Sequence, residues 1–433
     1  MKNEITKSGI GNSSSKNYNA VILNVKTVKA VMIFVFTIFA CGLFAQPVVT
    51  SFSPLSGPVG TMVTISGSGF NTSLANNIVF FGAAIGTVSF SSATSLTVSV
   101  PAGANYQYIS VTNLDVNLTG YSLKPFLFTF PGGCKPPVFE TGVAFTAGTQ
   151  PYSVNICDID GDGKSDLAVA NLGSNTVSVF RNISTSGGVS FAPNVDFATG
   201  GNPISVSYGD LDGDGKPDLA IANSGSNTVS VLKNTSPSGT VSFAAKVDFT
   251  TGLLPQGVSI GDIDMDGKPD MVVVNQAGNS TSVFRNTSTG GVINSGSFAA
   301  KVDFASGSGP KSVSIGDIDG DGKPDVVVAN SVNADVAVLR NTSVSGVINS
   351  GSFAASVYFS TFNGTVGYNP WSVCIGDIDG DGKPELVVAN FFENVNMVSS
   401  VSLFQNISTS GNVNFASSIY FYPGSKASSV KLG

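Results

Sequence analysis

Residues 317–325 read DIDGDGKPD, and close variants of these nine residues occur five times in the second part of the chain. The copies begin at Asp158, Asp210, Asp262, Asp317 and Asp377, so they lie 52, 52, 55 and 60 residues apart. A repeat of this size is typical of propellers, solenoids and arrays of small units. This repeat organises the chain from residue 138 onward.

Each repeat has the composition of four short strands. An apolar segment such as VSIG precedes the acidic residues, VVVAN follows them, and segments such as TVSVFRN and FAPNVDF complete the unit. Four strands per repeat match one blade of a β-propeller. The segment that begins at Phe139 resembles the fourth-strand segment that begins at Phe191. We therefore expect the first segment to complete the last blade and close the ring, which removes exposed strand edges.

The last residues, SSVKLG, align with the apolar segments that precede Asp317 and Asp377, and Gly433 corresponds to Gly376. A sixth acidic copy would follow at once. We expect the sequence to be a fragment of a longer protein, whose ring has six to eight blades.

Residues 1–45 have the pattern of an export signal. Five lysines precede the run VMIFVFTIFACGLFA, which is too short for a typical membrane span and suits a signal peptide. We expect cleavage near Ala45–Gln46 and a secreted or cell-surface protein. A lipoprotein signal with Cys41 as the lipidated residue and an uncleaved anchor are the alternatives.

Composition excludes several classes of function. Without residues 1–45 the net charge changes from −7 to −11, which does not favour nucleic acid or insertion into an anionic membrane. The chain has no histidine, and this excludes histidine-based acid–base catalysis and histidine zinc ligands. Cys134, Cys157 and Cys374 show no zinc spacing; a Cys134–Cys157 bridge and buried free thiols remain open.

Residues 47–130 form a separate unit. Apolar runs such as MVTISGSGF, NNIVFFG and SLTVSVPAG alternate with Gly, Pro and Asn turns, which predicts six or seven strands in a β-sandwich. Residues 131–137, PGGCKPP, read as a linker. The whole chain is expected to be all-β.

The acidic repeats place carboxylates at positions 1, 3, 5 and 9 and glycine at position 6, where a sharp turn needs it. With the position-7 carbonyl and water, the loop offers the six or seven oxygens that Ca²⁺ prefers; Mg²⁺ ranks second. Apolar residues at position 12 distinguish the loop from an EF-hand. The candidate ligands are Asp158, Asp160, Asp162, Lys164, Asp166, Asp210, Asp212, Asp214, Lys216, Asp218, Asp262, Asp264, Asp266, Lys268, Asp270, Asp317, Asp319, Asp321, Lys323, Asp325, Asp377, Asp379, Asp381, Lys383 and Glu385, with each lysine binding through its carbonyl.

These motifs resemble known families. The D-x-D-x-D-G-K-x-D/E repeats of residues 138–433 resemble FG-GAP/VCBS repeats, which implies a calcium-binding β-propeller with ligands at these positions. Glu385 in place of the final Asp and Met265 in place of glycine depart from the pattern. SPLSGPVGT, VFFG and SVPAG in residues 47–130 resemble an IPT/TIG immunoglobulin-like domain, which implies a spacer or adhesive module.

Two weaker signals have structural alternatives. Asn-x-Ser/Thr sequences recur at a fixed place in each repeat, where turn residues are favoured over glycosylation sites; they start at Asn182, Asn234, Asn286, Asn341 and Asn406. Trp371 precedes the fifth acidic copy, and packing is favoured over stacking on a sugar.

We expect the chain to bind a ligand and not to catalyse a reaction. Twenty of the 27 carboxylates beyond residue 45 belong to the acidic repeats, which leaves few for catalysis, and we expect no enzyme. The expected function is calcium-dependent adhesion or ligand binding, with a polysaccharide or an extracellular protein as partner. The alternatives are an accessory region of a secreted polysaccharide-active enzyme and a calcium-stiffened spacer.

Overall fold

The computed structural model describes residues 46–82, 84–102, 104, 107–129, 142–185, 188–361, 369–391, 399–424 and 426–432. The chain divides into two units, Met1–Phe44 and Ala45–Gly433, and the account below concerns the second. The expected signal peptide, the expected linker, Cys41 and Cys134 lie outside the described residues. In the part of the chain that is described, no helix is long and apolar enough to cross a membrane.

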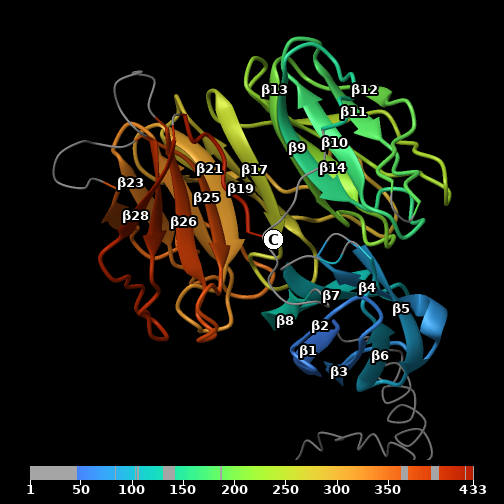
Figure 1. Ribbon diagram of the computed structural model, residues 1–433. Helices are drawn as coiled ribbons and strands as arrows, with labels where there is room; N and C mark the ends of the chain where they lie inside the picture. The colour runs from blue at the N-terminus through green and yellow to red at the C-terminus, as the bar shows by residue number, and fades with distance from the viewer. Residues whose placement is uncertain are drawn as a thin grey trace, which may run out of the picture. The chain divides into compact units, whose positions relative to one another are not determined.

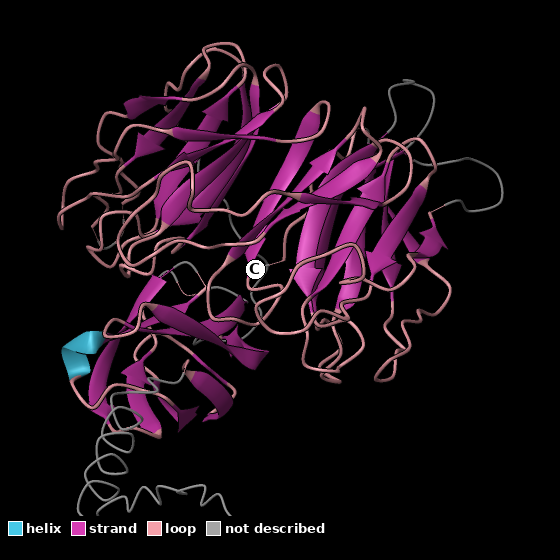
Figure 2. Ribbon diagram, turned by 180° about the vertical axis from the view of Figure 1, so that it is seen from behind, coloured by secondary structure: helices cyan, strands magenta, loops and turns pink. Residues whose placement is uncertain are grey.

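The first domain is all-β except for one short 3-10 helix. Its strands run in the order β1-β3-β6-β5-β4-β7-β8-β2. Strand β5 pairs with β4 near its start and with β6 near its end, so the sheet folds around one core (Figure 2). The elements are β1 (Val48–Ser53), β2 (Ser56–Gly57), β3 (Met62–Ser68), η1 (Leu74–Asn76), β4 (Asn77–Phe81), β5 (Ala84–Ser91), β6 (Ser95–Ser99), β7 (Gln107–Asn113) and β8 (Leu118–Phe128).

Alternating side chains of both halves of this sheet fill the core. Val63 and Ile65 of β3 and Ile109 and Val111 of β7 are fully buried, as the period-2 pattern of a strand requires. The rings of Phe81 and Phe126 meet edge to face at 5.3 Å, a geometry worth about 0.5–1.5 kcal/mol beyond burial. The predicted β-sandwich is confirmed, with eight strands in the described residues where six or seven were expected.

The acidic repeats form five four-stranded sheets, each of which is one blade (Figure 1). Within each blade, consecutive strands pair antiparallel. The strands are β9 (Pro151–Cys157), β10 (Asp166–Asn171), β11 (Thr176–Phe180) and β12 (Val195–Ala198) in blade 1; β13 (Pro203–Gly209), β14 (Asp218–Asn223), β15 (Thr228–Leu232) and β16 (Val247–Thr250) in blade 2; β17 (Pro255–Gly261), β18 (Asp270–Asn275), β19 (Ser280–Phe284) and β20 (Val302–Ala305) in blade 3; β21 (Pro310–Gly316), β22 (Asp325–Asn330), β23 (Asp335–Leu339) and β24 (Val357–Ser360) in blade 4; and β25 (Asn369–Gly376), β26 (Glu385–Phe391), β27 (Ser399–Phe404) and β28 (Ile419–Gly424) in blade 5.

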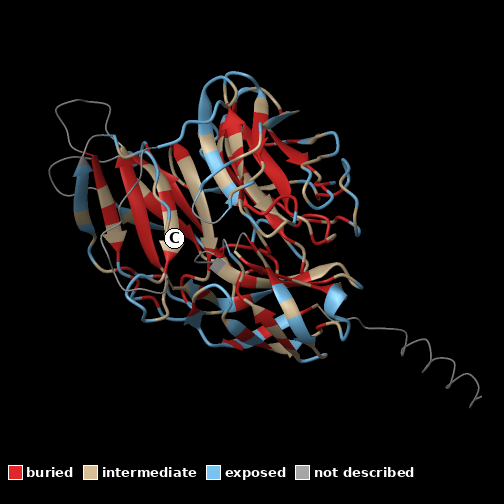
Figure 3. Cartoon of the chain, turned by 45° about the vertical axis from the view of Figure 1, so that its right-hand side comes forward, coloured by how far each residue is buried: buried red, intermediate tan, exposed pale blue. Residues whose placement is uncertain are grey.

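The second strand of each blade is its most buried element. Every residue of β14, β18 and β22 is buried, and the sequences DLAIAN, DMVVVN and DVVVAN are accordingly apolar on both faces (Figure 3). Neighbouring blades cover both faces of such a strand, so the hydrophobic run is continuous instead of alternating. This burial holds the start of the second strand, where the acidic loop ends, in a fixed place.

Adjacent blades meet through two recurring contacts. A phenylalanine of the fourth strand in blades 1 to 4 packs edge to face on a phenylalanine of the next repeat, as in the 5.0 Å pair of Phe197 and Phe243. The glycine that ends the first strand of blades 2 and 3 makes room for an isoleucine of the next blade: a Cβ on Gly209 would approach Ile260 within 2.7 Å, and one on Gly261 would approach Ile315 within 3.2 Å. Blade packing therefore favours glycine at these two positions.

The two ends of the repeat region bear on the predicted closure of the ring. Val430 N–H donates to Ser372 Oγ at 3.3 Å, as Val373 N–H does to Ser312 Oγ at 3.2 Å, so the last residues take the place of a following first strand, as their alignment predicts. The expectation that the segment from Phe139 completes the last blade of a longer ring stays a prediction. Residues 142–148 are in no strand, but the ring of Phe145 packs edge to face on Phe191 of blade 1 at 5.2 Å, as Phe197 of β12 packs on Phe243 of the next repeat.

Candidate metal centres

Each acidic motif is the tight loop between the first and second strands of its blade. We number these acidic loops 1 to 5: 158–166, 210–218, 262–270, 317–325 and 377–385. Glycine at position 6 adopts a left-handed conformation in every loop, with φ of 88° at Gly267, which explains the requirement for glycine. Position 4 is also left-handed, and Met265 adopts it with φ of 54° where the other loops have glycine. Met265 therefore leaves the course of the loop unchanged.

Three carboxylates converge in each loop. One oxygen each from positions 1, 3 and 9 lies within 4.8 Å of the other two, and the five clusters repeat this arrangement. They are Asp158, Asp160 and Asp166; Asp210, Asp212 and Asp218; Asp262, Asp264 and Asp270; Asp317, Asp319 and Asp325; and Asp377, Asp379 and Glu385. The longer side chain of Glu385 reaches its cluster like the aspartates of the other loops.

Backbone N–H groups hold the carboxylates in place. In loop 3, Asp262 Oδ2 accepts from Gly267 N–H at 2.9 Å. Asp270 accepts from Ile263 N–H at 3.0 Å and from Asn286 N–H at 2.7 Å, which ties the two ends of the loop together. The other loops repeat these bonds, so the backbone preorganises the three carboxylates.

Positions 5 and 7 lie outside the clusters of three carboxylates. The clusters contain positions 1, 3 and 9 but not position 5. The position-5 carboxylate accepts the backbone N–H of position 7, at 3.0 Å between Asp266 and Lys268. The Lys268 side chain donates to the Ser288 carbonyl at 2.7 Å, and Lys216 and Lys323 make equivalent bonds. The five lysine carbonyls gain no support as ligands from these bonds, which engage the N–H and ammonium groups of the lysines.

Burial makes the clustered charges costly. Burial, with further contributions from neighbouring carboxylates, raises the pKa of Asp158 to about 6 and that of Asp262 to about 7, although the backbone N–H of the position-6 glycine opposes the rise. One buried oxygen each of Asp160, Asp210 and Asp264 accepts no hydrogen bond from the described residues. A cation that prefers oxygen ligands would coordinate these oxygens and offset the repulsion between the carboxylates. The donor set therefore fits Ca²⁺.

A basic side chain that sequence reasoning missed faces each of the first four loops. Lys233 Nζ contacts Asp212 and lies 2.7 Å from Asp214, and Arg285 Nη1 lies 3.4 Å from Asp266 and 3.8 Å from Asp264. Arg181 and Arg340 take the same place, whereas loop 5 has the neutral Gln405, 3.0 Å from Asp379. The signal was present in the sequence, since this residue always precedes the Asn-x-Ser/Thr triplet.

The asparagines of the Asn-x-Ser/Thr triplets are structural. Asn234, Asn286, Asn341 and Asn406 are each at most 1% exposed, and their side-chain amides donate to backbone carbonyls. A buried amide that already uses its hydrogens cannot carry a glycan in the folded protein. Their role as turn residues, favoured from the sequence, is supported.

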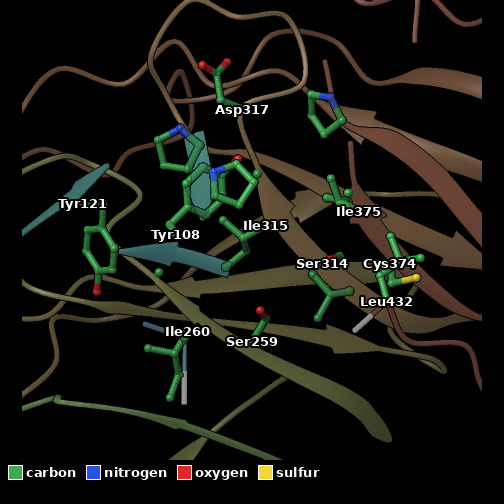
Figure 4. Close-up of a pocket in the computed structure, with 18 of the residues that line it drawn as sticks. Tyr108, Tyr121, Ser259, Ile260, Ser314, Ile315, Asp317, Cys374, Ile375 and Leu432 are labelled. Carbon is green, nitrogen blue, oxygen red and sulfur yellow. The ribbon is translucent and has the colours of Figure 1, made fainter. Parts of the chain in front are cut away.

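The first strands of the blades line a pocket. Figure 4 shows Ile260, Ile315 and Ile375 around it, with Ser259 and Ser314 on the same strands. Mixed apolar and hydroxyl groups on a rigid strand scaffold are common in ligand pockets.

Trp371 has a packing role. It stacks on Phe391 at 4.2 Å, and the Lys311 ammonium lies 5.1 Å from its ring centre. These neighbours account for its position without a bound sugar.

The two described cysteines are free thiols. Cys157 is buried and Cys374 is partly buried. Burial raises the pKa of Cys374 to about 11, which keeps this thiol protonated and unreactive near neutral pH.

Comparison with known structures gives distant likenesses. The chain is similar to an auxiliary nutrient binding protein from Bacteroides ovatus (11% identity, 86% of each chain covered, TM-score 0.36). It is also similar to an Agrocybe aegerita lectin that recognises non-reducing terminal N-acetylglucosamine (18% identity, 84% of this chain and 88% of that chain, TM-score 0.43). A third is a candidate 6-phosphogluconolactonase from Bacteroides fragilis (14%, 82% and 84%, TM-score 0.43). At these scores the likenesses carry no argument about ligand or activity. No curated protein matches the chain.

Family models match most of the described chain. The FG-GAP-like repeat model matches residues 158–221, 210–273, 262–328 and 331–388, and the IPT/TIG model matches residues 47–130. The repeats and the blades fit a ligand-binding β-propeller. The matches, the five blades and the recurring acidic loops place this chain in the FG-GAP-like repeat family, with an IPT/TIG domain before its propeller.

Proposed function

We propose that this chain is an exported calcium-binding recognition protein, whose propeller binds a polysaccharide or an extracellular protein without catalysing a reaction. The observation that carries the calcium part is the recurrence of three converging carboxylates in all five loops. A solvated acidic turn would not need buried carboxylate oxygens that lack a donor, yet loops 1, 2 and 3 each have one.

Calcium would act as a structural cation here. Its charge neutralises the cluster, and the loop backbone supplies the fixed geometry. Positions 1, 3 and 9 would hold the ion. Extracellular calcium modules bind with dissociation constants on the order of 10⁻⁴ to 10⁻³ M, so these sites would fill outside a cell and stay largely empty inside one.

Carboxylates outside the loops have structural partners, which supports recognition over catalysis. Asp196, Asp248 and Asp303 each accept a 2.6 Å bond from a serine of the neighbouring strand. The serine in turn accepts from the asparagine that ends the second strand, as Ser230 does from Asn223 at 2.8 Å. These hydrogen bonds hold the fourth strand in its blade and occupy the three carboxylates in structural contacts.

The pocket of the first strands is the proposed recognition surface. Its isoleucines and serines suit a ligand with apolar faces and hydroxyl groups, as sugars have. A bulky replacement at Ser314 would narrow the pocket without touching an acidic loop.

Calcium titration of the chain from Gln46, followed by glycan and matrix-protein arrays in calcium and in EDTA, tests the proposal. We expect saturable calcium binding and array binding that disappears in EDTA and in Ser314→Trp. A folded protein that binds calcium but no array ligand would contradict recognition and favour a spacer or an accessory region. A folded protein without calcium binding would overturn the metal assignment.

A further inference from the structure

One asparagine side chain joins consecutive acidic loops. The Asn286 amide donates to the Pro269 carbonyl in loop 3 of its own blade and to the Leu211 carbonyl in loop 2 of the preceding blade, both at 2.8 Å. The same pair of bonds recurs three times, with distances between 2.7 and 3.0 Å. These bonds join Asn234 to Pro217 and Ile159, Asn341 to Pro324 and Ile263, and Asn406 to Pro384 and Ile318.

We call each such pair of asparagine bonds a bridge. The asparagine and the residue that it reaches in the preceding loop each donate a backbone N–H to a carboxylate of a candidate metal cluster. Leu211, whose carbonyl accepts from Asn286, donates its own N–H to Asp218 of loop 2 at 3.0 Å. On the other side, the backbone N–H of Asn286 donates to Asp270 of loop 3 at 2.7 Å. A continuous path of hydrogen bonds therefore runs from the last carboxylate of one loop to the last carboxylate of the next.

No other residue type could replace these asparagines without loss. The Asn286 Oδ1 accepts from Ser288 N–H at 2.8 Å, so the side chain uses its acceptor as well as both donor directions. In a site 1% exposed, loss of the amide removes a buried hydrogen bond from the Pro269 carbonyl and one of two from the Leu211 carbonyl. Ser288 Oγ adds a second bond to the Leu211 carbonyl, at 2.8 Å.

We propose that these asparagines are positioning residues that couple calcium binding in one loop to calcium binding in the next. This inference rests on the proposed calcium function of the loops. Calcium in loop 3 fixes Asp270 and hence Asn286, which orders the Leu211 peptide that holds Asp218 in loop 2. The coupling is reciprocal, so calcium in loop 2 favours calcium in loop 3 by the same factor.

The chain supplies matched controls. Asn182 of blade 1 donates only within its own blade, to the Ser165 carbonyl at 2.9 Å. Ser236, equivalent to Ser288, donates to Ser242 of its own blade at 3.2 Å and makes no bond to a preceding loop in the described structure. Asn182→Ala and Ser236→Ala therefore remove similar groups without removing a bridge.

Calcium titration calorimetry tests the coupling. The variants are Asn286→Ala, Ser288→Ala and the two controls. Each is made in the intact chain and again in an Asp212→Asn chain, in which loop 2 is inactive. We expect Ser288→Ala to weaken one site about threefold to tenfold, the range for one lost hydrogen bond, only where loop 2 is intact. Asn286→Ala should weaken two sites in the intact chain and one in the Asp212→Asn chain.

The outcomes separate this inference from the calcium proposal. If the starting chain binds calcium but Ser288→Ala and Asn286→Ala act equally with and without loop 2, the coupling is overturned and the calcium sites stand. If the starting chain binds no calcium, both fall. Ser288→Ala keeps the test decisive if Asn286→Ala does not fold, because it removes only the second bond to the Leu211 carbonyl and so weakens the connection between the loops without removing the asparagine.

Discussion

Acidic loops 3 and 5 have the same carboxylate geometry in different surroundings. In loop 3, Asp262, Asp264 and Asp270 are all at most 7% exposed, and residues of blade 4 cover the loop. In loop 5, Asp379 is exposed and Asp377 is partly exposed, while only Glu385 is buried. Within the described residues, no asparagine of a following blade bonds to loop 5.

The side chain that faces the carboxylates also differs between the two loops. Arg285 faces loop 3, whereas Gln405 takes this place at loop 5. Burial makes charge in loop 3 costly and Arg285 partly offsets that cost, while water solvates the charge of loop 5. The comparison teaches that one loop sequence can give sites of different strength, because the neighbouring blade sets the dielectric and the charge.

Calcium removal should have the largest effect. A ligand at about a hundred times its dissociation constant stabilises the folded state by about 2.7 kcal/mol for each site. We expect EDTA to lower the free energy of unfolding, measured in denaturant, by several times this amount. Hydrogen exchange should then increase first at loop 5, which has less cover. Equal stability in calcium and EDTA would contradict structural metal sites.

Asp264→Asn and Asp379→Asn compare the two loops directly. In calcium, Asp264→Asn should cost about 2–3 kcal/mol, because a buried site is lost, and Asp379→Asn less than about 1 kcal/mol. In EDTA the sign should reverse for Asp264→Asn, since it removes a buried charge one oxygen of which accepts no hydrogen bond from the described residues. Denaturant unfolding under both conditions measures each change. Similar costs in both loops would show that burial does not set site strength.

The repeat spacing predicted the blades because each strand and each turn has a local signal. The period, the VSIG and VVVAN segments and glycine at position 6 together determine four strands and a loop, and the structure confirms them. The position-5 carboxylates stay a prediction. Asp266 lies outside the cluster of positions 1, 3 and 9, and its Oδ1 accepts the N–H of Lys268.

The sequence could not predict the contacts between blades. The bond from Asn286 to Leu211 spans 75 residues, and nothing in a nine-residue motif indicates its partner. The fixed spacing of the Asn-x-Ser/Thr triplets was visible, yet spacing alone could not distinguish a turn from a bridge. Burial, which decides the cost of each carboxylate, also depends on the neighbouring blade.

The pH dependence of the calcium-free protein should follow the buried loops. Burial raises the pKa of Asp262 to about 7 from an ordinary value of about 3.9, so the neutral form is favoured in the fold. The stability from this group is therefore greatest at low pH and lost as pH rises through about 7. In EDTA, we expect a higher melting temperature at pH 5.5 than at pH 8, and a weaker dependence in Asp262→Asn. A lower melting temperature at pH 5.5 would contradict this account.

Exchanging the residue types at positions 285 and 405, which face loops 3 and 5, should have the smallest effect on calcium binding. Arg285→Gln removes a cation that competes with calcium for Asp264, so calcium should bind loop 3 more tightly, by up to about fivefold, as expected for a partly exposed pair. Gln405→Arg should weaken loop 5 by a similar factor, and Arg285→Lys, which keeps the charge as Lys233 does in loop 2, should change little. Calcium titration calorimetry measures all three. If Arg285→Gln weakens calcium binding, the arginine orients the carboxylates more than it competes for them, and the difference between the loops then rests on burial alone.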